Sequence, residues 1–264
     1  MSEWKGQTAL ITGASYGIGE AFAHRLAADG TQLILTARSR DRLEALAREL
    51  HQRHGVNVNV IEADLAQPIA PEELFRETER AHLRVDLLIN NAGFGTIGEF
   101  AGLPLARQLE MIQVNVNALV ALSHLYLQPM IERRAGAVIN VASTAAFQAV
   151  PYFAVYAATK AFVLTFSEAL WAEYREQGVR VMALCPGPTT THFQQVAGTE
   201  RRHPSKRMQT PEEVVEAGLQ ALARGRSHVI SGFGNLVQTE IERFVPRDLV
   251  TRVAGRLYRP FVTE

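Results

Sequence analysis

Cysteine and long hydrophobic runs are the two features that this sequence most clearly lacks. A single cysteine, Cys185, among 264 residues excludes a disulfide framework and a multi-cysteine metal site, so we expect no metal. No apolar stretch approaches the roughly 18 residues that a membrane helix needs. The start, MSEWKGQTALITG, has no cationic segment leading into a long apolar run. We therefore expect no transmembrane segment, no signal peptide and a cytoplasmic location.

A net charge is also absent. The 27 Lys and Arg residues balance the 27 Asp and Glu residues, so the formal net charge is zero. The basic residues are spread along the chain, whereas proteins that bind nucleic acid usually concentrate them in a patch. We expect no nucleic-acid partner.

Lysine is scarce even among the basic residues. Of 27 basic residues 24 are arginine, and the only lysines are Lys5, Lys160 and Lys206. Lys160 lies within VYAATKAFVLTF (155–166), a segment that is otherwise apolar almost throughout. A chain that uses arginine nearly everywhere therefore needs a specific reason for lysine at this position.

Short apolar runs alternate with longer helical patterns along the chain. The predicted strands are residues 8–13, 31–37, 56–65, 83–93, 136–143, 179–187 and 227–232. Helical patterns such as 18–30 and 39–55 separate them, which indicates βαβ units and a parallel sheet. Right-handed crossovers favour a doubly wound arrangement. With 47% hydrophobic and 20% charged residues, an ordinary globular composition, we predict one α/β domain over residues 1–264.

Two segments interrupt the alternation. Residues 188–209 are polar and lack periodicity, which is typical of a mobile flap over a site. Residues 233–264 form a predicted helical tail, in which Leu249, Val253 and Leu257 recur at helical spacing. We favour a surface helix packed on its own domain or on a neighbouring subunit. A basic amphipathic helix on an anionic membrane is the alternative.

The segment TGASYGIG (12–19) joins the first strand to the first helix. Its three glycines, at 13, 17 and 19, let the backbone turn tightly and approach a ligand closely. The helix N-terminus that follows offers free N–H groups and a positive dipole end, which suit a pyrophosphate. The spacing differs from the common G-x-G-x-x-G fingerprint, and glycines also serve plain tight packing. In a strand–turn–helix context we favour phosphate binding.

The end of the second strand indicates which dinucleotide would bind. An NAD site usually has an acidic residue about 20 residues beyond the glycine turn, bonded to the ribose 2′-hydroxyl. Here the strand ends in Arg38-Ser39-Arg40, and the first acid is Asp41. A guanidinium at this point pairs with a 2′-phosphate, so the sequence favours NADP(H). After the third strand, Asp64 is placed to accept from the adenine amino group.

Lys160 follows Tyr156 by four residues, so the two share one face of a helix. A phenol titrates near pH ~10, and a neighbouring ammonium lowers that pKa and makes tyrosine usable in acid–base chemistry. Lysine is a compact charge with rotatable donors, whereas arginine favours bidentate partners. The bland alternative is a lysine that reaches out to water along an amphipathic helix.

Together these features resemble the short-chain dehydrogenase/reductase family. The residues that carry the resemblance, in order and at matching strand ends, are Thr12–Gly19, Asn90–Gly93, Asn115, Ser143, Tyr156, Lys160 and Pro186-Gly187. The likeness covers about residues 6–232. It implies a single Rossmann domain with a seven-stranded parallel sheet and helices on both faces. The implied chemistry is hydride exchange between a nicotinamide and a carbonyl or alcohol carbon.

The resemblance also implies roles for individual residues. Tyr156 is the proton donor or acceptor, and Ser143 hydrogen-bonds the substrate oxygen. Lys160 holds the nicotinamide ribose and lowers the pKa of Tyr156, while Asn115 helps to hold a water in a proton relay. The implied cofactor-binding residues are Gly13, Ser15, Tyr16, Gly17, Ile18, Gly19, Arg38, Asp64, Leu65, Asn91, Ala92, Gly93, Tyr156, Lys160, Pro186, Gly187, Thr189 and Thr191.

The segment between Ser143 and Tyr156 should border the substrate, and it is largely apolar. The predicted substrate-pocket residues are Phe94, Ser143, Phe147, Val150, Tyr152 and Phe193. We expect no arginine or lysine on this wall, which favours a neutral, apolar ketone or aldehyde over a carboxylate.

The sequence thus predicts an NADP(H)-dependent reductase, or the reverse dehydrogenase, of a small apolar carbonyl compound. One alternative is a 3-oxoacyl-thioester reductase, for which Arg201, Arg202, Lys206 and Arg207 would form a basic landing site. Another is a non-catalytic dinucleotide sensor or scaffold, which the complete set of Ser143, Tyr156 and Lys160 disfavours. The helix predicted over 155–177 is apolar on more than one face, so we also expect a homodimer or homotetramer.

Overall fold

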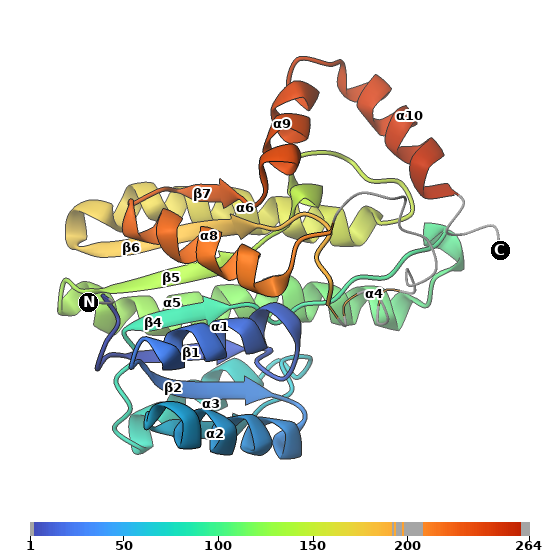
Figure 1. Ribbon diagram of the computed structural model, residues 1–264. Coiled ribbons are helices and arrows are strands. Elements are labelled where there is room, and N and C mark those ends of the chain that lie inside the picture. The colour runs from blue at the N-terminus through green and yellow to red at the C-terminus, as the bar shows by residue number, and fades with distance from the viewer. Residues whose placement is uncertain (1–2, 192, 194–196, 198–207, 260–264) are drawn as a thin grey trace.

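The computed structural model describes residues 3–191, 193, 197 and 208–259. A seven-stranded sheet in the order β3-β2-β1-β4-β5-β6-β7 forms its centre, and every pairing is parallel. The strands are β1 Thr8–Thr12, β2 Gln32–Ala37, β3 Val58–Glu62, β4 Leu87–Asn90, β5 Gly136–Val141, β6 Val179–Cys185 and β7 His228–Ile230. The predicted doubly wound parallel sheet is confirmed (Figure 1).

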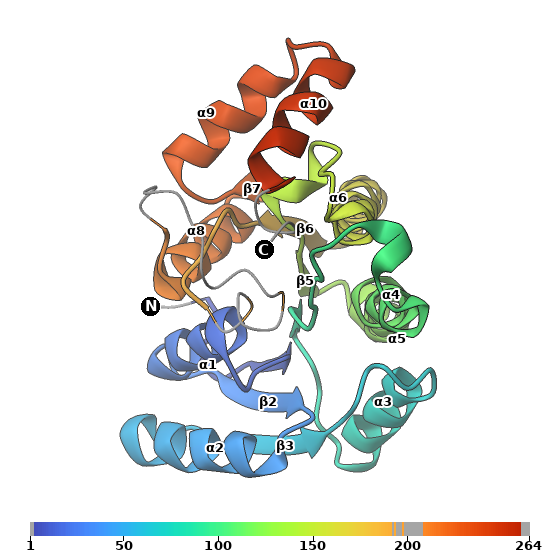
Figure 2. The same cartoon turned by 90° about the vertical axis from the view of Figure 1, so that its right-hand side faces the viewer.

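Helices cover both faces of the sheet (Figure 2). Helices α1, α2 and α8 lie on one face, and α3, α4, α5 and α6 lie on the other. Their bounds are α1 Gly17–Ala28, α2 Arg40–His54, α3 Ala70–Arg80, α4 Leu105–Ile112, α5 Ala118–Glu132, α6 Ala154–Tyr174 and α8 Pro211–Ala223, and the tail adds α9 Phe233–Glu242 and α10 Arg247–Tyr258.

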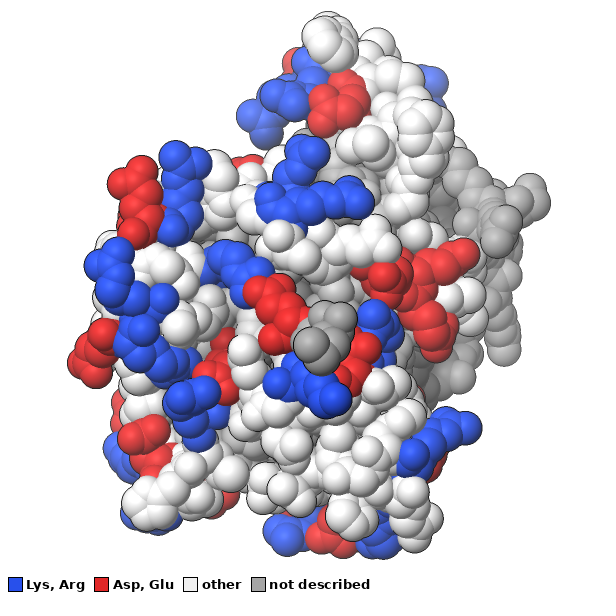
Figure 3. Space-filling view, turned by 60° about the vertical axis from the view of Figure 1, so that its left-hand side comes forward, with Lys and Arg blue, Asp and Glu red and all other residues white. Residues whose placement is uncertain are grey.

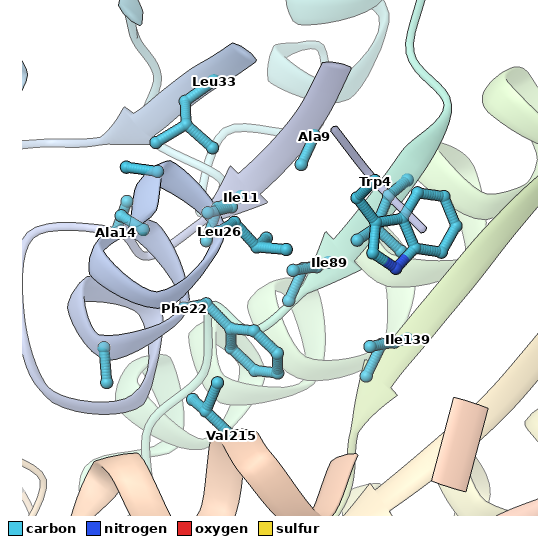
Figure 4. Packing of buried hydrophobic residues seen from close by; sticks show 14 of the residues in the cluster. Trp4, Ala9, Ile11, Ala14, Phe22, Leu26, Leu33, Ile89, Ile139 and Val215 are labelled. Atoms are coloured by element: carbon cyan, nitrogen blue, oxygen red, sulfur yellow. The ribbon is translucent and has the colours of Figure 1, made fainter. Parts of the chain in front are cut away.

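Each face of the sheet carries its own apolar core. On the first face, Phe22 and Leu26 of α1 are fully buried against the sheet residue Ile11 and against Val215 of α8 (Figure 4). Full burial of a side chain of this size contributes roughly 1.5–3 kcal/mol. The strands are buried on both faces, which explains why they appear in the sequence as continuous apolar runs rather than as alternating patterns.

The strand order reverses between β1 and β4, and this reversal decides where a ligand fits. The chain leaves β1 toward β2 on one side, whereas β4 lies on the other side of β1. The connections after the two strands diverge, so a crevice opens beyond their carboxyl ends. The turn after β1 (13–16) and the segment Asn91–Gly93 after β4 meet at this point.

A buried polar ladder joins the middle of the sheet to two helices. Asn90 on β4 donates to Asn140 on β5 at 2.9 Å and to Ser123 on α5 at 3.1 Å, and Asn140 donates to Ser167 on α6 at 2.9 Å. Buried amides are costly unless they are hydrogen-bonded. The ladder therefore favours a single arrangement of α5 and α6 against the sheet.

The irregular segment predicted over 188–209 falls largely outside the described residues. Its ends are held together, because Thr189 bridges Gln209 in a parallel pair and Thr190 donates to the carbonyl of Gln209 at 3.0 Å. The predicted basic landing site at 201, 202, 206 and 207 lies outside the described residues.

The predicted helical tail consists of two helices, α9 and α10, which form a hairpin at one end of the sheet (Figures 1 and 2). Helix α10 packs on its own domain, but not through the expected apolar face. Leu249, Val253 and Leu257 are exposed by 49%, 47% and 64%, whereas Ala254 is buried. Apolar spacing shows that a helix has two faces, but it cannot say which one meets the domain.

Charges of both signs are interspersed on the face seen in Figure 3. Some charged residues are paired with a neighbour on the same helix, such as Arg40 with Glu44 on α2 and Arg76 with Glu72 on α3, both at 2.8 Å. Exposed pairs of this kind contribute little to stability. Among the described residues, no helix is both long enough and apolar enough to cross a membrane.

Candidate active site

The glycine turn is tightly packed and has backbone angles that favour glycine. Gly13 and Gly17 have φ values of +65° and +60°, which residues with a Cβ rarely adopt. A Cβ at Gly13 would lie 2.9 Å from the Cα of Ala92, and a Cβ at Gly19 would collide with the carbonyl of Gly13. The side chain of the N-cap residue Tyr16 makes no capping hydrogen bond to α1. The turn can therefore present the helix N-terminus to a ligand.

Asn91 fixes the glycine turn against the end of β4. Its side-chain amide donates to the carbonyls of Thr12 and Gly13 at 2.9 and 3.2 Å, while the Thr12 hydroxyl accepts from the backbone N–H groups of Asn91 and Ala92 at 2.9 and 3.0 Å. Ile18 packs on the core beneath the turn. These predicted residues therefore form one rigid floor.

Three arginines, Arg38, Arg40 and Arg42, lie at the end of β2 and the start of α2. Arg38 is exposed and forms no ion pair within the part of the chain that the structure describes. Arg40, in contrast, is paired with Glu44. Arg42 lies 3.6 Å from the ring centroid of Tyr16 and donates to the carbonyl of Ser15 at 3.3 Å. The sequence indicated Arg38 but gave no reason to select Arg42.

Asp64 and Leu65 follow β3, as predicted. One carboxylate oxygen of Asp64 accepts from the backbone N–H of Ala66 at 3.2 Å, and Leu65 is buried in the second core. Asp64 also lines a cavity of about 250 Å³ between the end of β3 and α3. Both residues follow β3 at the edge of the sheet, and the adenine contact expected of Asp64 stays a prediction.

Lys160 is buried and reaches across to the sheet. Only 5% of its surface is exposed, and its Nζ donates to the backbone carbonyl of Val141, at the end of β5, at 2.7 Å. Burial lowers the pKa of Lys160 from 10.5 to about 8. The lysine does not reach out to water, so the bland alternative is wrong.

Tyr156 stands one helical turn before Lys160, with Ser143 beside it. Burial raises the pKa of Tyr156 to about 12, and a hydrogen bond with Ser143 acts in the opposite direction. The net shift of the Tyr156 pKa is therefore upward in this structure, and the lowering by Lys160 that the family resemblance implies stays a prediction. The lysine Nζ lies 5.8 Å from the centroid of the phenol ring and donates a hydrogen bond to the carbonyl of Val141. Burial lowers the pKa of Lys160, which disfavours its charged form.

Asn115 lies in a π-helical turn, Gln113–Asn117, between α4 and α5. Its side chain accepts from the N–H of Phe94 at 3.1 Å and donates to the carbonyl of Phe94 at 2.9 Å and to the hydroxyl of Thr159 at 3.1 Å. Turns of this type occur frequently at functional sites. A Cβ at Gly93 would lie 3.0 Å from Asn115 and 3.4 Å from the Nζ of Lys160, so Asn115 and Lys160 face the same backbone.

The segment after β6 follows the predicted course. The carbonyl of Pro186 accepts from the N–H of Thr144 at 2.9 Å, and the hydroxyl of Thr189 donates to the carbonyl of Gly187 at 2.9 Å. A Cβ at Gly17 would lie 3.0 Å from the Cβ of Thr191. The start of the flap thus contacts the glycine turn.

An apolar cluster surrounds Tyr156 on the side away from Lys160. Its members are Ile97, Ala145, Val150, Phe153, Tyr156, Ala157, Phe193, Ala197 and Tyr258. The rings of Phe193 and Tyr156 are 5.4 Å apart. The predicted pocket residues Val150 and Phe193 are therefore brought together beside Tyr156.

Two other predicted pocket residues do not belong to this cluster. Phe147 packs in a separate core near His228, with ring centroids 6.1 Å apart. Tyr152 has a φ of +67° and its carbonyl accepts from the N–H of Gly98 at 3.0 Å. Strand periodicity does not extend through this loop, so the sequence could not say which of its side chains point inward.

An arginine lies against Phe94, one of the predicted pocket residues. The guanidinium of Arg107, on α4, lies 3.8 Å from the centroid of the Phe94 ring and is paired with Glu110 at 2.7 Å. The expectation of a pocket wall without arginine or lysine stays a prediction. The carboxylate partner reduces the positive charge that this wall presents.

Two aromatic residues of the cluster around Tyr156 are not among the predicted pocket residues. The ring of Phe153 lies 5.8 Å from that of Tyr156. Tyr258, more than 100 residues further along the chain, contacts Phe153 with ring centroids 5.6 Å apart. No local pattern connects residues so far apart in the sequence.

Comparison with known proteins supports this arrangement. The sequence profile of the family described as short chain dehydrogenase matches residues 7–202. The chain is 32% identical over 238 residues to a 7beta-hydroxysteroid dehydrogenase from Collinsella aerofaciens, covering 89% of each chain. It is 31% identical to the very-long-chain 3-oxoacyl-CoA reductase-B of Danio rerio, covering 86% of this chain and 74% of the relative.

A solved structure is also similar. It is a short-chain dehydrogenase from Sphingobium yanoikuyae in complex with NADPH, and it is 34% identical with a TM-score of 0.80. The match covers 85% of this chain and 87% of that one.

The buried lysine makes stability depend on pH in a defined way. Between the folded pKa of Lys160, about 8, and its unfolded value, the unfolded chain binds more protons, so the free energy of unfolding rises with pH. Replacing Lys160→Met removes this term. We expect the free energy of unfolding of the wild type, minus that of Lys160→Met, to rise by roughly 2 kcal/mol between about pH 7.5 and about pH 10. Urea denaturation measures both free energies. Lys5→Met, at an exposed lysine, is the control, and parallel curves for wild type and Lys160→Met would contradict the prediction.

Proposed function

The chain belongs to the short-chain dehydrogenase/reductase family, whose members are oxidoreductases that act on hydroxyl or carbonyl groups with a nicotinamide cofactor; from this premise we propose that it is an NADP(H)-dependent reductase of apolar ketones or aldehydes, or the reverse dehydrogenase. The observation that carries the proposal is the convergence of Ser143, Tyr156 and Lys160 at the end of β5, beside the glycine turn.

The chain's own residues fit a dinucleotide. The glycines at 13, 17 and 19 let the turn pack closely on Ala92, Asn91 and Thr191, and the N-terminus of α1 has no side-chain cap, which suits a pyrophosphate. Thr191 and the Asn91–Gly93 segment border the same crevice. A bound nicotinamide supplies the hydride that the carbonyl carbon receives.

Proton transfer falls to Tyr156. In the reductive direction the neutral phenol donates its proton to the substrate oxygen, which Ser143 orients through its hydroxyl. A pKa of about 12 keeps the phenol protonated at neutral pH, as a proton donor must be before the reaction. The ammonium of Lys160 stabilises the phenolate that forms. Charged groups of a bound cofactor and substrate would replace the hydration that burial removes from this phenolate.

The substrate class follows from the cluster around Tyr156. Val150, Phe153 and Phe193 give this side of the site an apolar surface. Among the described residues, one guanidinium lies nearby, that of Arg107. It contacts the ring of Phe94 and is paired with Glu110. A neutral, apolar carbonyl compound therefore suits the pocket better than a carboxylate, and the hydroxysteroid dehydrogenase among the relatives agrees with this choice.

A 3-oxoacyl-thioester reductase is the second candidate. The similarity to a very-long-chain 3-oxoacyl-CoA reductase favours it, while the basic residues that would receive its phosphate groups lie outside the described residues. A screen of apolar ketones, aldehydes and acyl thioesters with NADPH, followed by nicotinamide absorbance, separates the two candidates.

The choice of NADP(H) over NAD(H) rests on Arg38. One similar structure is a complex with NADPH, and another, 24% identical, is a complex with NAD, so the fold alone is compatible with both. A free guanidinium at the end of β2, with no carboxylate before Asp41, favours a 2′-phosphate.

The first test removes the proposed acid. Tyr156→Phe deletes only the phenol hydroxyl, so the variant should fold and bind NADPH while kcat falls by roughly 10²-fold or more. Tyr174→Phe, a half-buried tyrosine at the other end of α6, is the matched control and should keep normal turnover. Near-normal kcat in Tyr156→Phe would rule out this mechanism.

The second test concerns the cofactor. Charge-assisted pairing with Arg38 should make NADPH bind more tightly than NADH by ~1.5–3 kcal/mol, and Arg38→Asp should reverse the preference. The control is Arg40→Asp, two residues away at a site already paired with Glu44. Titrations by nicotinamide fluorescence measure the dissociation constants of both cofactors for all three proteins, and equal affinities in the wild type would refute the prediction.

The third test concerns assembly. We propose a homodimer or homotetramer, because α4 and α6 leave Leu105, Leu109 and Phe162 exposed on the outer face of the domain. Light scattering should give at least twice the 29.2 kDa of one chain. Phe162→Arg should reduce that mass, whereas Phe244→Arg, exposed on the tail, should not. A monomer at micromolar concentration would count against the proposal.

A further inference from the structure

The α9–α10 hairpin is attached to the site at its first end. Asn235, near the start of α9, donates to the carbonyl of Ser231 at 2.8 Å, and a Cβ at Gly187 would collide with its side-chain amide. The side-chain amide of Gln209 lies 2.8 Å from the hydroxyl of Ser231. The hairpin therefore begins beside Pro186-Gly187, at the point where both ends of the flap meet.

The other end of the hairpin reaches the catalytic helix. Tyr258, in the last turn of α10, packs on Phe153 with the two rings inclined by 73°, and Phe153 packs on Tyr156 with the rings inclined by 63°. Edge-to-face contacts of this kind are favourable and have a preferred geometry. A row of three rings thus connects the end of α10 to the proposed catalytic phenol.

Small residues allow this close approach. Ala254 is 4% exposed, and a Cβ at Gly255 would lie 3.4 Å from the ring of Pro151. Helix α10 thus rests on the loop between Val150 and Phe153, which is the loop that borders the substrate. Its large apolar residues Leu249, Val253 and Leu257 point away from this contact and are exposed. Tyr258 is the large side chain that α10 contributes to the cluster around Tyr156.

The electrostatics agree with this proximity. A negative charge on Tyr258 would raise the pKa of Tyr156, and burial raises the pKa of Tyr258 as well. The two phenols therefore lie within range of each other in a poorly solvated space.

We propose that the α9–α10 hairpin is the outer wall of the substrate pocket, and that the ring of Tyr258 is a specificity-determining contact for bulky apolar ketones. The inference rests on the proposed function and names the substrate class of the same site. A small ketone held by Ser143 and Tyr156 is covered by Phe193 and Phe153 and does not extend to Tyr258. A ketone with a large apolar substituent extends past Phe153 and buries that substituent against the Tyr258 ring.

The test compares two ketones in the wild type and in variants at one position. The probes are butan-2-one, which is small, and benzophenone, which is bulky, each reduced with NADPH. We expect Tyr258→Ala to raise KM for benzophenone roughly tenfold, the scale of a lost apolar pocket contact. Its kcat/KM for butan-2-one and its dissociation constant for NADPH should stay within about twofold of the wild type, because neither ligand reaches the ring.

Two further variants separate the ring from other causes. Tyr258→Phe keeps the ring and should retain the wild-type KM for benzophenone. Leu257→Ala changes the neighbouring residue, which points outward with 64% of its surface exposed, and should leave both ketones unaffected.

The possible results divide cleanly. An equal loss of kcat for both ketones in Tyr258→Ala would mean that Tyr258 merely supports Phe153 and Tyr156, and no change for either ketone would mean that the hairpin does not border the substrate. Both results overturn the inference while leaving the proposed function intact. A wild type that binds NADPH and reduces neither ketone would count against the proposed function, and the inference would fall with it.

Discussion

The hydrogen bond from the ammonium of Lys160 to the carbonyl of Val141 is the interaction on which the site depends. It joins α6 to the last residue of β5 at 2.7 Å, inside apolar surroundings where an unpaired charge would be expensive. This bond fixes how far along the sheet α6 lies. Tyr156, one turn earlier, is thereby held against Ser143, which follows the same strand. A single bond thus sets the relative positions of three functional residues.

The surrounding polar groups hold the same arrangement from other directions. Asn115 ties the loop after β4 to Thr159 on α6, and Asn140 ties β5 to Ser167 further along that helix. Because all these groups are buried, each must keep its partner, and the helix has little freedom to shift. The cost of this burial appears in two pKa values, because burial lowers the pKa of Lys160 and raises that of Tyr156. The geometry is therefore preorganised before a ligand supplies the missing solvation.

The tail shows where prediction from the sequence reached its limit. Apolar periodicity located a helix near 247–258, because side chains at helical spacing share a face. It could not identify the face that contacts the domain, where Ala254, Gly255 and Tyr258 meet the loop before α6 while the larger apolar residues are exposed. The loop between Ser143 and Tyr156 posed the same difficulty. Without a regular repeat, its sequence gave no reason to separate Phe153 from Phe147.

The sequence by itself determined the sheet, and it predicted the glycine turn, the arginine after the second strand and a shared helix face for Tyr156 and Lys160. These features are local, because hydrophobic period, backbone freedom and spacing along one helix depend on neighbouring residues alone. Only the tertiary structure decided which carbonyl receives the lysine, which direction the two pKa values take, and which distant ring completes the substrate side. Those outcomes depend on burial and on contacts between residues such as Phe153 and Tyr258, which lie far apart in the chain and meet only when it folds.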